Sequence, residues 1–492
     1  MATIRHSAVV VVGAGPTGLA LACELALAGL SCLVLDRRPG PRADSRAICL
    51  HARSMEMLDL RGQADKFIDA GLPVPSFPLG LKGAAISFAR LDSDFPYILD
   101  IPQSKIENLL KARALELGAR IQWSAQVTGI EQNPQCAAVT LADGTVCQAS
   151  YVVGCDGTRS FVREAVGIPF PGAANPGSVI LADLHLSGLG MGDAHGELSQ
   201  AGMLLVFPFR DGACRVVLYD SARASAGVDE PVTLDEVRES LIRITGQDAG
   251  ARDMEWSGRY RSESRQATTY RSGRIFLAGD AAHSHSPAGA QGMNTGLQDA
   301  LNLGWKLAGA HRGWAPDWLL DTYHAERHPV GADVLALTGR QFKLNTARTR
   351  AGRALRWAAQ RMIAPLPPVQ SSLARSYSGV AVRYPPGPAA THPWAGVRLP
   401  PGRVTLSDGS SARLYDLFHD GTFVLFQPQD VPGLPRVPDP VRSISYRTAG
   451  SPLPAALLVR PDGYVAWASD ERDASTRSAS ASAAVRAWCG AA

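Results

Sequence analysis

The stretch Ala8-Val-Val-Val-Val-Gly-Ala-Gly-Pro-Thr-Gly-Leu-Ala-Leu-Ala-Cys-Glu-Leu-Ala-Leu-Ala-Gly-Leu-Ser-Cys-Leu-Val-Leu-Asp36 decides the fold of this chain. Its β-branched run at 8–12 predicts a strand buried on both faces of a parallel sheet. The next turn has the spacing G-x-G-x-x-G, and residues 19–28 predict an apolar helix that ends at Gly29. Residues 31–35 predict a second buried strand. This order predicts an α/β fold with a Rossmann-like unit.

The glycines of this unit have distinct physical roles. Gly13 permits the tight turn, Gly15 lets the backbone approach a pyrophosphate, and Gly18 lets the helix pack on the strand. The helix N-terminus then presents free N–H groups to the anion. Asp36 lies 23 residues after Gly13, where a carboxylate accepts hydrogen bonds from a ribose diol. We therefore expect a dinucleotide site, with a glycine-rich turn of an unrelated α/β protein as the alternative.

The same apolar run also resembles a signal peptide or a membrane anchor. Against this, Gly13, Gly15 and Gly18 interrupt it, and Glu24 would lie inside the bilayer at a cost of a few kcal/mol. We expect neither export nor a membrane partner.

Length and composition describe an ordinary globular protein. The 492 residues predict about three domains. Lys+Arg 49 against Asp+Glu 45 leaves a net charge of +4, which offers no strong field for nucleic acid or an anionic membrane. The eight cysteines include no C-x-x-C and no zinc-type spacing, so we expect reduced thiols, no metal and a cytoplasmic protein.

Two later segments extend the first motif. Residues 149–160 predict a strand that ends in Asp156-Gly157 and leads into a helix. Residues 273–280 predict another buried strand ending in an acid, followed by a loop to Asn294 and a helix over 295–310. No second G-x-G-x-x-G follows a strand, and there is no redox cysteine pair. This argues against disulfide reductases and against enzymes that bind FAD and NADPH on separate Rossmann units.

The three motifs together resemble those of the class A flavoprotein aromatic hydroxylases, which are single-component FAD monooxygenases. The resemblance implies FAD as cofactor, NADPH or NADH as reductant and O2 as co-substrate, with oxygen transferred from a flavin C4a-hydroperoxide. No metal or nucleophilic side chain is required for such chemistry. We assign no general base and no certain catalytic residue.

The resemblance also implies residue roles. Arg46 would contact FAD phosphate, Asp280 the ribityl chain and Pro287 the isoalloxazine ring, while Asp156 belongs to a motif linked to FAD and NAD(P)H. A helix beginning near residues 292–294 would direct its N–H groups at the flavin N1/O2 edge. Relatives often have Gly-Gly where this chain has Gly289-Ala290. The full set of expected cofactor-binding residues is Gly13, Gly15, Gly18, Asp36, Arg37, Arg46, Gln103, Asp156, Asp280, Pro287, Gly292, Met293 and Asn294, of which the last four are the flavin-edge candidates.

We expect residues 1–75, 100–175 and 268–345 to form a discontinuous Rossmann-like FAD domain. Residues 76–99 and 176–267 are expected to form an inserted antiparallel β-sheet substrate domain above the flavin. Residues 346–394 predict a helical and Pro-rich linker, with an Arg-rich helical stretch over 346–367 followed by a Pro-rich part through Pro388. Residues 395–492 resemble the thioredoxin-like domain of larger hydroxylases, without redox cysteines; a structural or dimerising role makes a homodimer the assembly to test.

Within these segments several residues draw attention. Phe207 and Pro208 are candidates for lining the substrate pocket, with aromatic core of the sheet as the alternative. His283 and His285 lack a third metal ligand, so we interpret them as structural loop residues. Glu326 and Arg327 suggest a buried polar network. Asp-Gly pairs at 143–144, 211–212 and 462–463 predict hairpin turns.

The segments 51–56 and 460–467 are similar to those of hydroxylases acting on aromatic polyketides, with rifamycin-inactivating monooxygenases close by. Hydroxylation of a polycyclic phenol or quinone is the first hypothesis. Oxygenative inactivation of an antibiotic, or Baeyer–Villiger insertion on the same scaffold, is the second. The third is a flavoprotein that sequesters an aromatic drug without turnover. The near-neutral charge fits a large, uncharged small-molecule substrate.

Overall fold

The largest sheet is built around the strand of the first motif. The computed structural model describes residues 4–41, 47–187, 194–286, 288–347, 349–388, 390–429, 439–450 and 453–490. The sheet has the order β17-β18-β11-β1-β2-β8, and its central strands β18, β11, β1, β2 and β8 run parallel. β9 and β10 continue it as an antiparallel hairpin. The strands are β1 (Ile4–Val12), β2 (Cys32–Leu35), β8 (Arg120–Gln122), β9 (Val127–Gln132), β10 (Ala137–Leu141), β11 (Val146–Gly154), β17 (Arg271–Ser272) and β18 (Ile275–Leu277).

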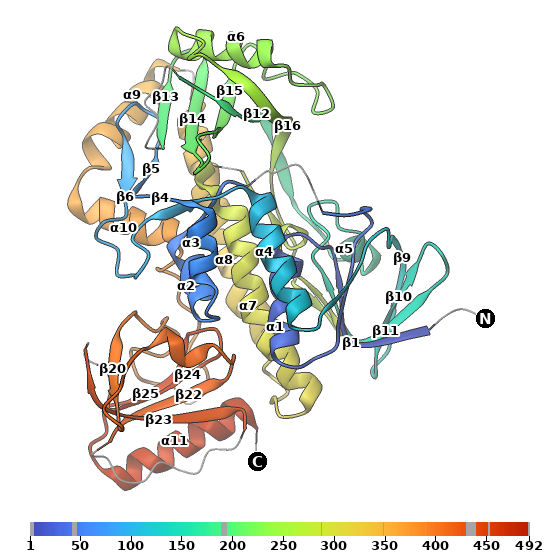
Figure 1. The fold of residues 1–492 in the computed structure, drawn as a ribbon, viewed down its shortest axis with the longest axis vertical. Coiled ribbons are helices and arrows are strands. Elements are labelled where there is room, and N and C mark those ends of the chain that lie inside the picture. The colour runs from blue at the N-terminus through green and yellow to red at the C-terminus, as the bar shows by residue number, and fades with distance from the viewer. Residues whose placement is uncertain are drawn as a thin grey trace.

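Helices cover this sheet, and one of them is the axis of the molecule. α1 (Pro16–Leu27) packs against α4 (Gln103–Glu116) and against α7 (Gln291–Arg312). α7 is buried continuously from Asn294 to Gly309 and passes through the centre of the molecule (Figure 1). It starts four residues before the predicted 295. α8 (Asp321–Asn345) lies beside it.

A second, antiparallel sheet lies at one end of α7 and α8. It has the order β13-β14-β15-β12-β16-β19. Its strands are β12 (Gly172–His185), β13 (His195–Leu198), β14 (Gly202–Pro208), β15 (Cys214–Asp220), β16 (Arg252–Gln266) and β19 (His283–Ser284). Successive side chains of β14 pack in different clusters: Leu204 and Val206 pack with α6 (Leu234–Thr245), whereas Leu205 and Phe207 join the large core around the first sheet. This period-two alternation gives the sheet one face toward the candidate site.

A third sheet, of order β21-β20-β23-β22-β24-β25, forms the C-terminal segment with α11 (Ala474–Cys489). β22 and β23 are parallel, and the other neighbours are antiparallel. Its strands are β20 (Arg403–Leu406), β21 (Ser411–Arg413), β22 (Phe423–Pro428), β23 (Val441–Ala449), β24 (Ala456–Val459) and β25 (Val465–Ser469). The hairpin turns predicted at the three Asp-Gly pairs are confirmed, because each separates antiparallel neighbours and each glycine has a positive φ.

Short elements join these layers. They are β3 (Cys49–Leu50), α2 (Ala52–Asp59), α3 (Ala64–Ala70), β4 (Leu72–Val74), β5 (Ser76–Pro78), β6 (Ala85–Ser87), β7 (Ile98–Asp100), α5 (Phe161–Ala165), α9 (Arg350–Ala358) and α10 (Pro367–Ser378), with single helical turns at 279–281, 288–290, 359–363 and 415–418. α10 corrects the expectation of a Pro-rich linker after residue 367. Pro367 lies at the start of the helix, where the missing N–H of proline costs nothing.

Across the described residues, none of the helices combines the length and the apolarity that crossing a bilayer requires. All eight cysteines are free, as expected.

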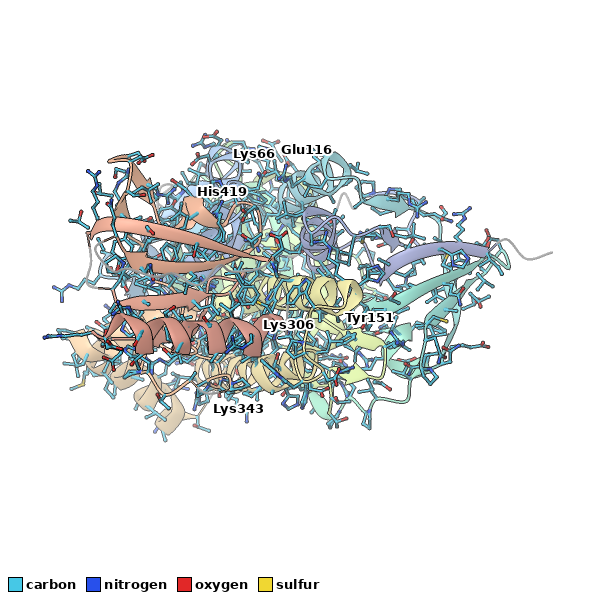
Figure 2. All side chains as sticks on the ribbon, turned by 90° about the horizontal axis from the view of Figure 1, so that it is seen from below. Lys66, Glu116, Tyr151, Lys306, Lys343 and His419 are labelled. Atoms are coloured by element: carbon cyan, nitrogen blue, oxygen red, sulfur yellow. The ribbon has the colours of Figure 1, made fainter. Side chains whose placement is uncertain are left out.

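A buried ion cluster fastens the C-terminal segment to α7 and α8. Arg460, which follows β24, donates to Glu326 of α8 at 2.6 Å and to Asp462 at 2.5 Å. Lys306 of α7 donates to the same Glu326 at 2.8 Å, and Figure 2 shows Lys306 close to α11. Burial raises the pKa of Glu326, but Arg460 and Lys306 outweigh this effect and lower the pKa to about 2. The predicted buried network around Glu326 is therefore confirmed.

We predict that Glu326→Ala lowers the free energy of unfolding by about 3–5 kcal/mol, because it leaves Lys306 and Arg460 buried without their shared carboxylate. Urea unfolding followed by tryptophan fluorescence measures this. The matched control is Glu197→Ala at the surface pair Lys82–Glu197, 3.8 Å apart, where we expect a loss below about 1 kcal/mol. Equal losses in the two variants would contradict the prediction.

Candidate functional site

The glycine turn between β1 and α1 has the geometry that its spacing predicts. Gly13 has φ +109°, and a Cβ there would lie 2.3 Å from the Cys155 carbonyl oxygen. A Cβ at Gly18 would lie 1.9 Å from the Gly13 oxygen. In the described part of the chain, no heavy atom beyond the residues next to it in sequence lies within 4 Å of a Cβ placed at Gly15. Two glycines therefore serve close packing, and the third leaves space in front of the N-terminus of α1.

Asp36 closes this turn from the end of β2. Its carboxylate accepts from the Ala14 N–H at 2.7 Å and from the Arg38 guanidinium at 2.8 and 2.9 Å. Burial raises the pKa of Asp36, but the hydrogen bonds from Arg38 and Ala14 outweigh this effect and lower it. Arg37, which was expected at the cofactor, is exposed, and its neighbour Arg38 makes the contact with Asp36.

The second motif lies directly against the glycine turn. The Asp156 nitrogen is 3.0 Å from the point where a Gly13 Cβ would project. The Asp156 carboxylate accepts from the Ser160 hydroxyl and from the Val162 N–H at 3.1 Å. Burial raises its pKa. In this structure Asp156 holds the first turn of α5 in place beside the glycine turn.

The third motif reaches the same place from β18. A Cβ at Gly279 would lie 2.5 Å from the Thr17 hydroxyl of α1, and a Cβ at Gly296 of α7 would lie 2.3 Å from the same oxygen. Asp280 follows Gly279 and is exposed. Its Oδ1 lies 3.9 Å from the Cβ position of Gly292 in the first turn of α7. Thus Asp280 and the N-termini of α1 and α7 meet in one region.

Asn294 fastens the N-terminus of α7 to the loop before α2. Its side-chain oxygen accepts from the His51 N–H at 2.8 Å, and its amide donates to the carbonyls of Cys49 and Ala290 at 3.1 and 2.9 Å. The Asn294 side chain is thereby used in positioning. Met293, the residue before it, is half-buried against the core.

His51 contacts the loop before α7. Its Nε2 donates to the Gly289 carbonyl at 2.9 Å, and burial lowers its pKa to about 4, so the imidazole is neutral at ordinary pH. In the same loop Ala290 has φ +51°, a left-handed conformation that costs a non-glycine residue about 1 kcal/mol. Ala290 is therefore held in a glycine-like conformation.

Gln103 is the first residue of α4. Its carbonyl accepts from the Ala47 N–H at 2.9 Å, and its amide donates to Glu107 at 2.7 Å. Arg46 and Pro287 lie outside the described residues.

A buried carboxylate behind α7 links the third motif to α8. Asp299 accepts from the Gly279 N–H at 3.0 Å, from His283 Nε2 at 2.6 Å and from Arg327 Nε at 2.6 Å. His285 stacks on His283 with ring centroids 5.9 Å apart. His283 and Arg327 thus bind the buried Asp299, and His283 lies in β19 rather than in a loop. The described residues contain no group of three metal-ligating side chains.

Aromatic side chains gather between the second sheet and the loop before α7. Phe207 of β14 packs on Phe77 of β5 at 5.6 Å, and Phe77 packs on Tyr377 of α10 at 5.9 Å and on His51 at 6.2 Å. We call Phe77, Phe207, Tyr377 and His51 the aromatic cluster. Pro208, the other predicted pocket residue, alternates to the opposite face of β14 and pairs in register with Cys214.

Sequence reasoning missed Arg38, Thr17, His51, Phe77 and Tyr377. Only Arg38 had a local signal, since it follows Asp36 by two residues. The others come together through contacts between segments far apart in the chain.

Comparison with known proteins gives two family matches. The FAD binding domain family matches residues 6–338, and the aromatic-ring hydroxylase C-terminal family matches residues 392–492. A rifampicin monooxygenase from Streptomyces venezuelae is 38% identical over 494 residues, covering 98% of this chain and 99% of the relative.

Solved structures share the whole fold. The anhydrotetracycline hydroxylase OxyS from Streptomyces rimosus superposes with a TM-score of 0.86 at 36% identity, covering 99% of this chain and 100% of its own. CabE, an aromatic hydroxylase from angucycline biosynthesis, has a TM-score of 0.84 at 34% identity, covering 99% of each chain.

We predict different outcomes for two glycine variants of the turn. Gly15→Ala should fold normally but bind FAD more weakly, by about tenfold or more, because its methyl projects into the space left for the pyrophosphate. Gly18→Ala should be destabilised, because its methyl collides with the Gly13 carbonyl. Thermal unfolding of the flavin-free proteins and flavin titration measure the two effects. Unchanged FAD affinity in Gly15→Ala would contradict the prediction.

Proposed function

The chain belongs to the family of FAD-dependent aromatic-ring hydroxylases, and we propose that it hydroxylates a polycyclic, polyketide-type aromatic substrate with NADPH or NADH as reductant and O2 as co-substrate. The observation that carries the proposal is the aromatic cluster beside the N-terminus of α7. Flat aromatic surfaces pack well on such rings. The relatives reported above act, by their names, on rifampicin and anhydrotetracycline.

The residues present fit FAD. The open space at Gly15 faces an α1 N-terminus that has no side-chain cap, which is the arrangement that binds a pyrophosphate. In the proposal Gly13, Gly15 and Gly18 surround the pyrophosphate, Asp36 with Arg38 reaches the adenosine ribose, and Asp280 reaches the ribityl chain. When bound, FAD supplies electron transfer and oxygen activation.

The chain's own residues then bind, orient and exclude water. The backbone N–H groups in the first turn of α7, at Gly292 and Met293, carry the positive end of a helix dipole and stabilise negative charge in front of them. His51 and Asn294 hold that turn through the bonds described above. The aromatic cluster holds the substrate ring and keeps water away from it. In this proposal Phe207 faces the substrate.

The proposal extends to the architecture. Residues 1–75, 100–175 and 268–345 act as the FAD domain, residues 76–99 and 176–267 as the substrate domain, and residues 395–492 as a thioredoxin-like domain that supports the fold and mediates a homodimer. We place the protein in the cytoplasm, where its free cysteines stay reduced.

We predict that the FAD-loaded protein oxidises NADPH or NADH faster when an aromatic polyketide is present, and that the product gains one oxygen atom. A panel of anhydrotetracyclines, angucyclinones and rifamycins, scored by absorbance and by product mass, measures this. A product only from rifamycins would assign the enzyme to antibiotic inactivation. A colourless protein after FAD addition, or ligand binding without consumption of reductant, would contradict the proposal.

Phe207→Ala should raise the KM for the substrate by about tenfold and leave the bound flavin unchanged, because the lost ring belongs to the aromatic cluster that we propose holds the substrate. The matched control is Val206→Ala, which lies on the face of β14 toward α6 and should leave KM unchanged. Steady-state kinetics at saturating reductant measure both variants. Equal effects of the two substitutions would mean that Phe207 is structural core.

Asp280→Ala should stay folded and bind FAD about tenfold more weakly, because an exposed carboxylate that accepts from the ribityl chain is lost. Asp321→Ala removes another exposed carboxylate and is the control. Fluorescence titration of the flavin-free proteins measures the affinity. Retained tight flavin binding would count against the ribityl role.

A further inference from the structure

The helical segment 350–366 turns apolar side chains outward. α9 continues into a π-helical turn at 359–363, just before α10. Five large apolar side chains of this segment are between 49% and 63% exposed, and they are five of the nine exposed ones in the described part of the chain: Leu355, Trp357, Met362, Ile363 and Leu366. Figure 1 shows α9 and α10 at the outer edge of the molecule, next to β13 and β6. Soluble proteins rarely leave so many apolar groups together in water.

The buried side of the same segment is polar. Arg356, Gln360 and Ala364 recur every four residues and are buried. Arg356 donates to the Asn345 carbonyl at 2.9 Å, and Gln360 donates to the Leu79 carbonyl at 2.9 Å. An ordinary surface helix does the reverse, with its apolar stripe inward and its polar residues in water. The outward apolar side chains are therefore not the exposed margin of an apolar stripe that faces the core.

The charged residues along this part of the sequence have one sign. Residues 334–407 contain eleven Lys or Arg and no Asp or Glu, so the rest of the chain carries 38 basic and 45 acidic residues. The net charge of +4 hides this separation. Arg340, Lys343, Arg350 and Arg361 are exposed and form no ion pair with any acid that the structure describes. Figure 2 shows Lys343 at the edge of the molecule.

We propose that this basic–apolar patch, formed by Leu355, Trp357, Met362, Ile363 and Leu366 with the neighbouring Arg350, Arg361 and Lys343, binds the surface of an anionic lipid bilayer. Basic side chains are attracted to anionic headgroups, and Trp, Leu and Ile side chains enter the headgroup boundary. The segment would lie on the bilayer without crossing it.

Charge also decides against a second copy of this chain on the patch. A two-fold symmetric contact would bring the basic side chains of this patch close to those of the same patch on the second copy. An anionic lipid surface neutralises them instead. The proposal does not depend on the proposed function, since the patch residues lie outside the flavin and substrate contacts described above.

The test is sedimentation of the FAD-loaded protein with vesicles of phosphatidylcholine containing about one third phosphatidylglycerol. We expect binding at low ionic strength, with weaker binding at high salt and to pure phosphatidylcholine. The triple variant Trp357→Ser, Met362→Ser, Ile363→Ser and the double variant Lys343→Glu, Arg350→Glu should each reduce the bound fraction by about fivefold or more. The control is Leu115→Ser, Ile242→Ser, which removes exposed apolar groups elsewhere.

Three outcomes would overturn the proposal: no sedimentation with the anionic vesicles, sedimentation that the patch variants leave unchanged, or an equal loss in the control variant. Analytical ultracentrifugation adds a fourth. If the triple variant turns a dimer into a monomer, the patch is an interface between copies. Flavin content and reductant oxidation without vesicles should match the unchanged protein in every variant, so that failure here is distinct from failure of the proposed function.

Discussion

Three segments meet at the first turn of α1 so closely that only glycine fits beside the Thr17 side chain. Thr17 of α1 touches the glycine positions 279 and 296, which belong to the end of β18 and to α7. Gly13 meets the end of β11 in the same way. Because protein interiors are close-packed, a methyl group added at these points would collide with the Thr17 side chain or with the Cys155 carbonyl, and that neighbour would have to shift. The relative positions of the N-termini of α1 and α7, and of Asp280 between them, follow from this contact.

α7 connects this region to distant parts of the molecule. Its first turn is tied to the loop at His51 by Asn294, and its middle is tied to α8 by Asp299 and Arg327. Its later turns reach the C-terminal segment through Lys306. One buried helix thus contacts the loop at His51, α8 and the C-terminal segment. A displacement at any of these places would strain the contacts at the other two, because separating buried ion pairs costs several kcal/mol of free energy.

Features of the fold and of the candidate site were predictable where the residues that form them are close together in the sequence. The glycine turn, Asp36 and the strands around them follow from short-range spacing, and the structure has them within a few residues of the predicted positions. α10 was missed because the prolines of this segment predicted a linker, whereas Pro367 starts a helix. His51, Phe77 and Tyr377 meet only after folding, since about 240 residues separate His51 from the Gly289 carbonyl that it contacts. The net charge of the whole chain did not reveal the basic segment 334–407, because the acidic residues elsewhere in the chain offset its charge.

The buried ion cluster has a consequence for the order of synthesis. Lys306 and Glu326 neutralise each other within the part of the chain made first, and Arg460 and Asp462 do so within the part made last. While the ribosome is still producing the final hundred or so residues, the earlier part can fold around a balanced pair without a stranded charge. The later part then arrives equally balanced, and on docking the bonds between Arg460 and Glu326 replace bonds to water without leaving an unpaired charge in this cluster.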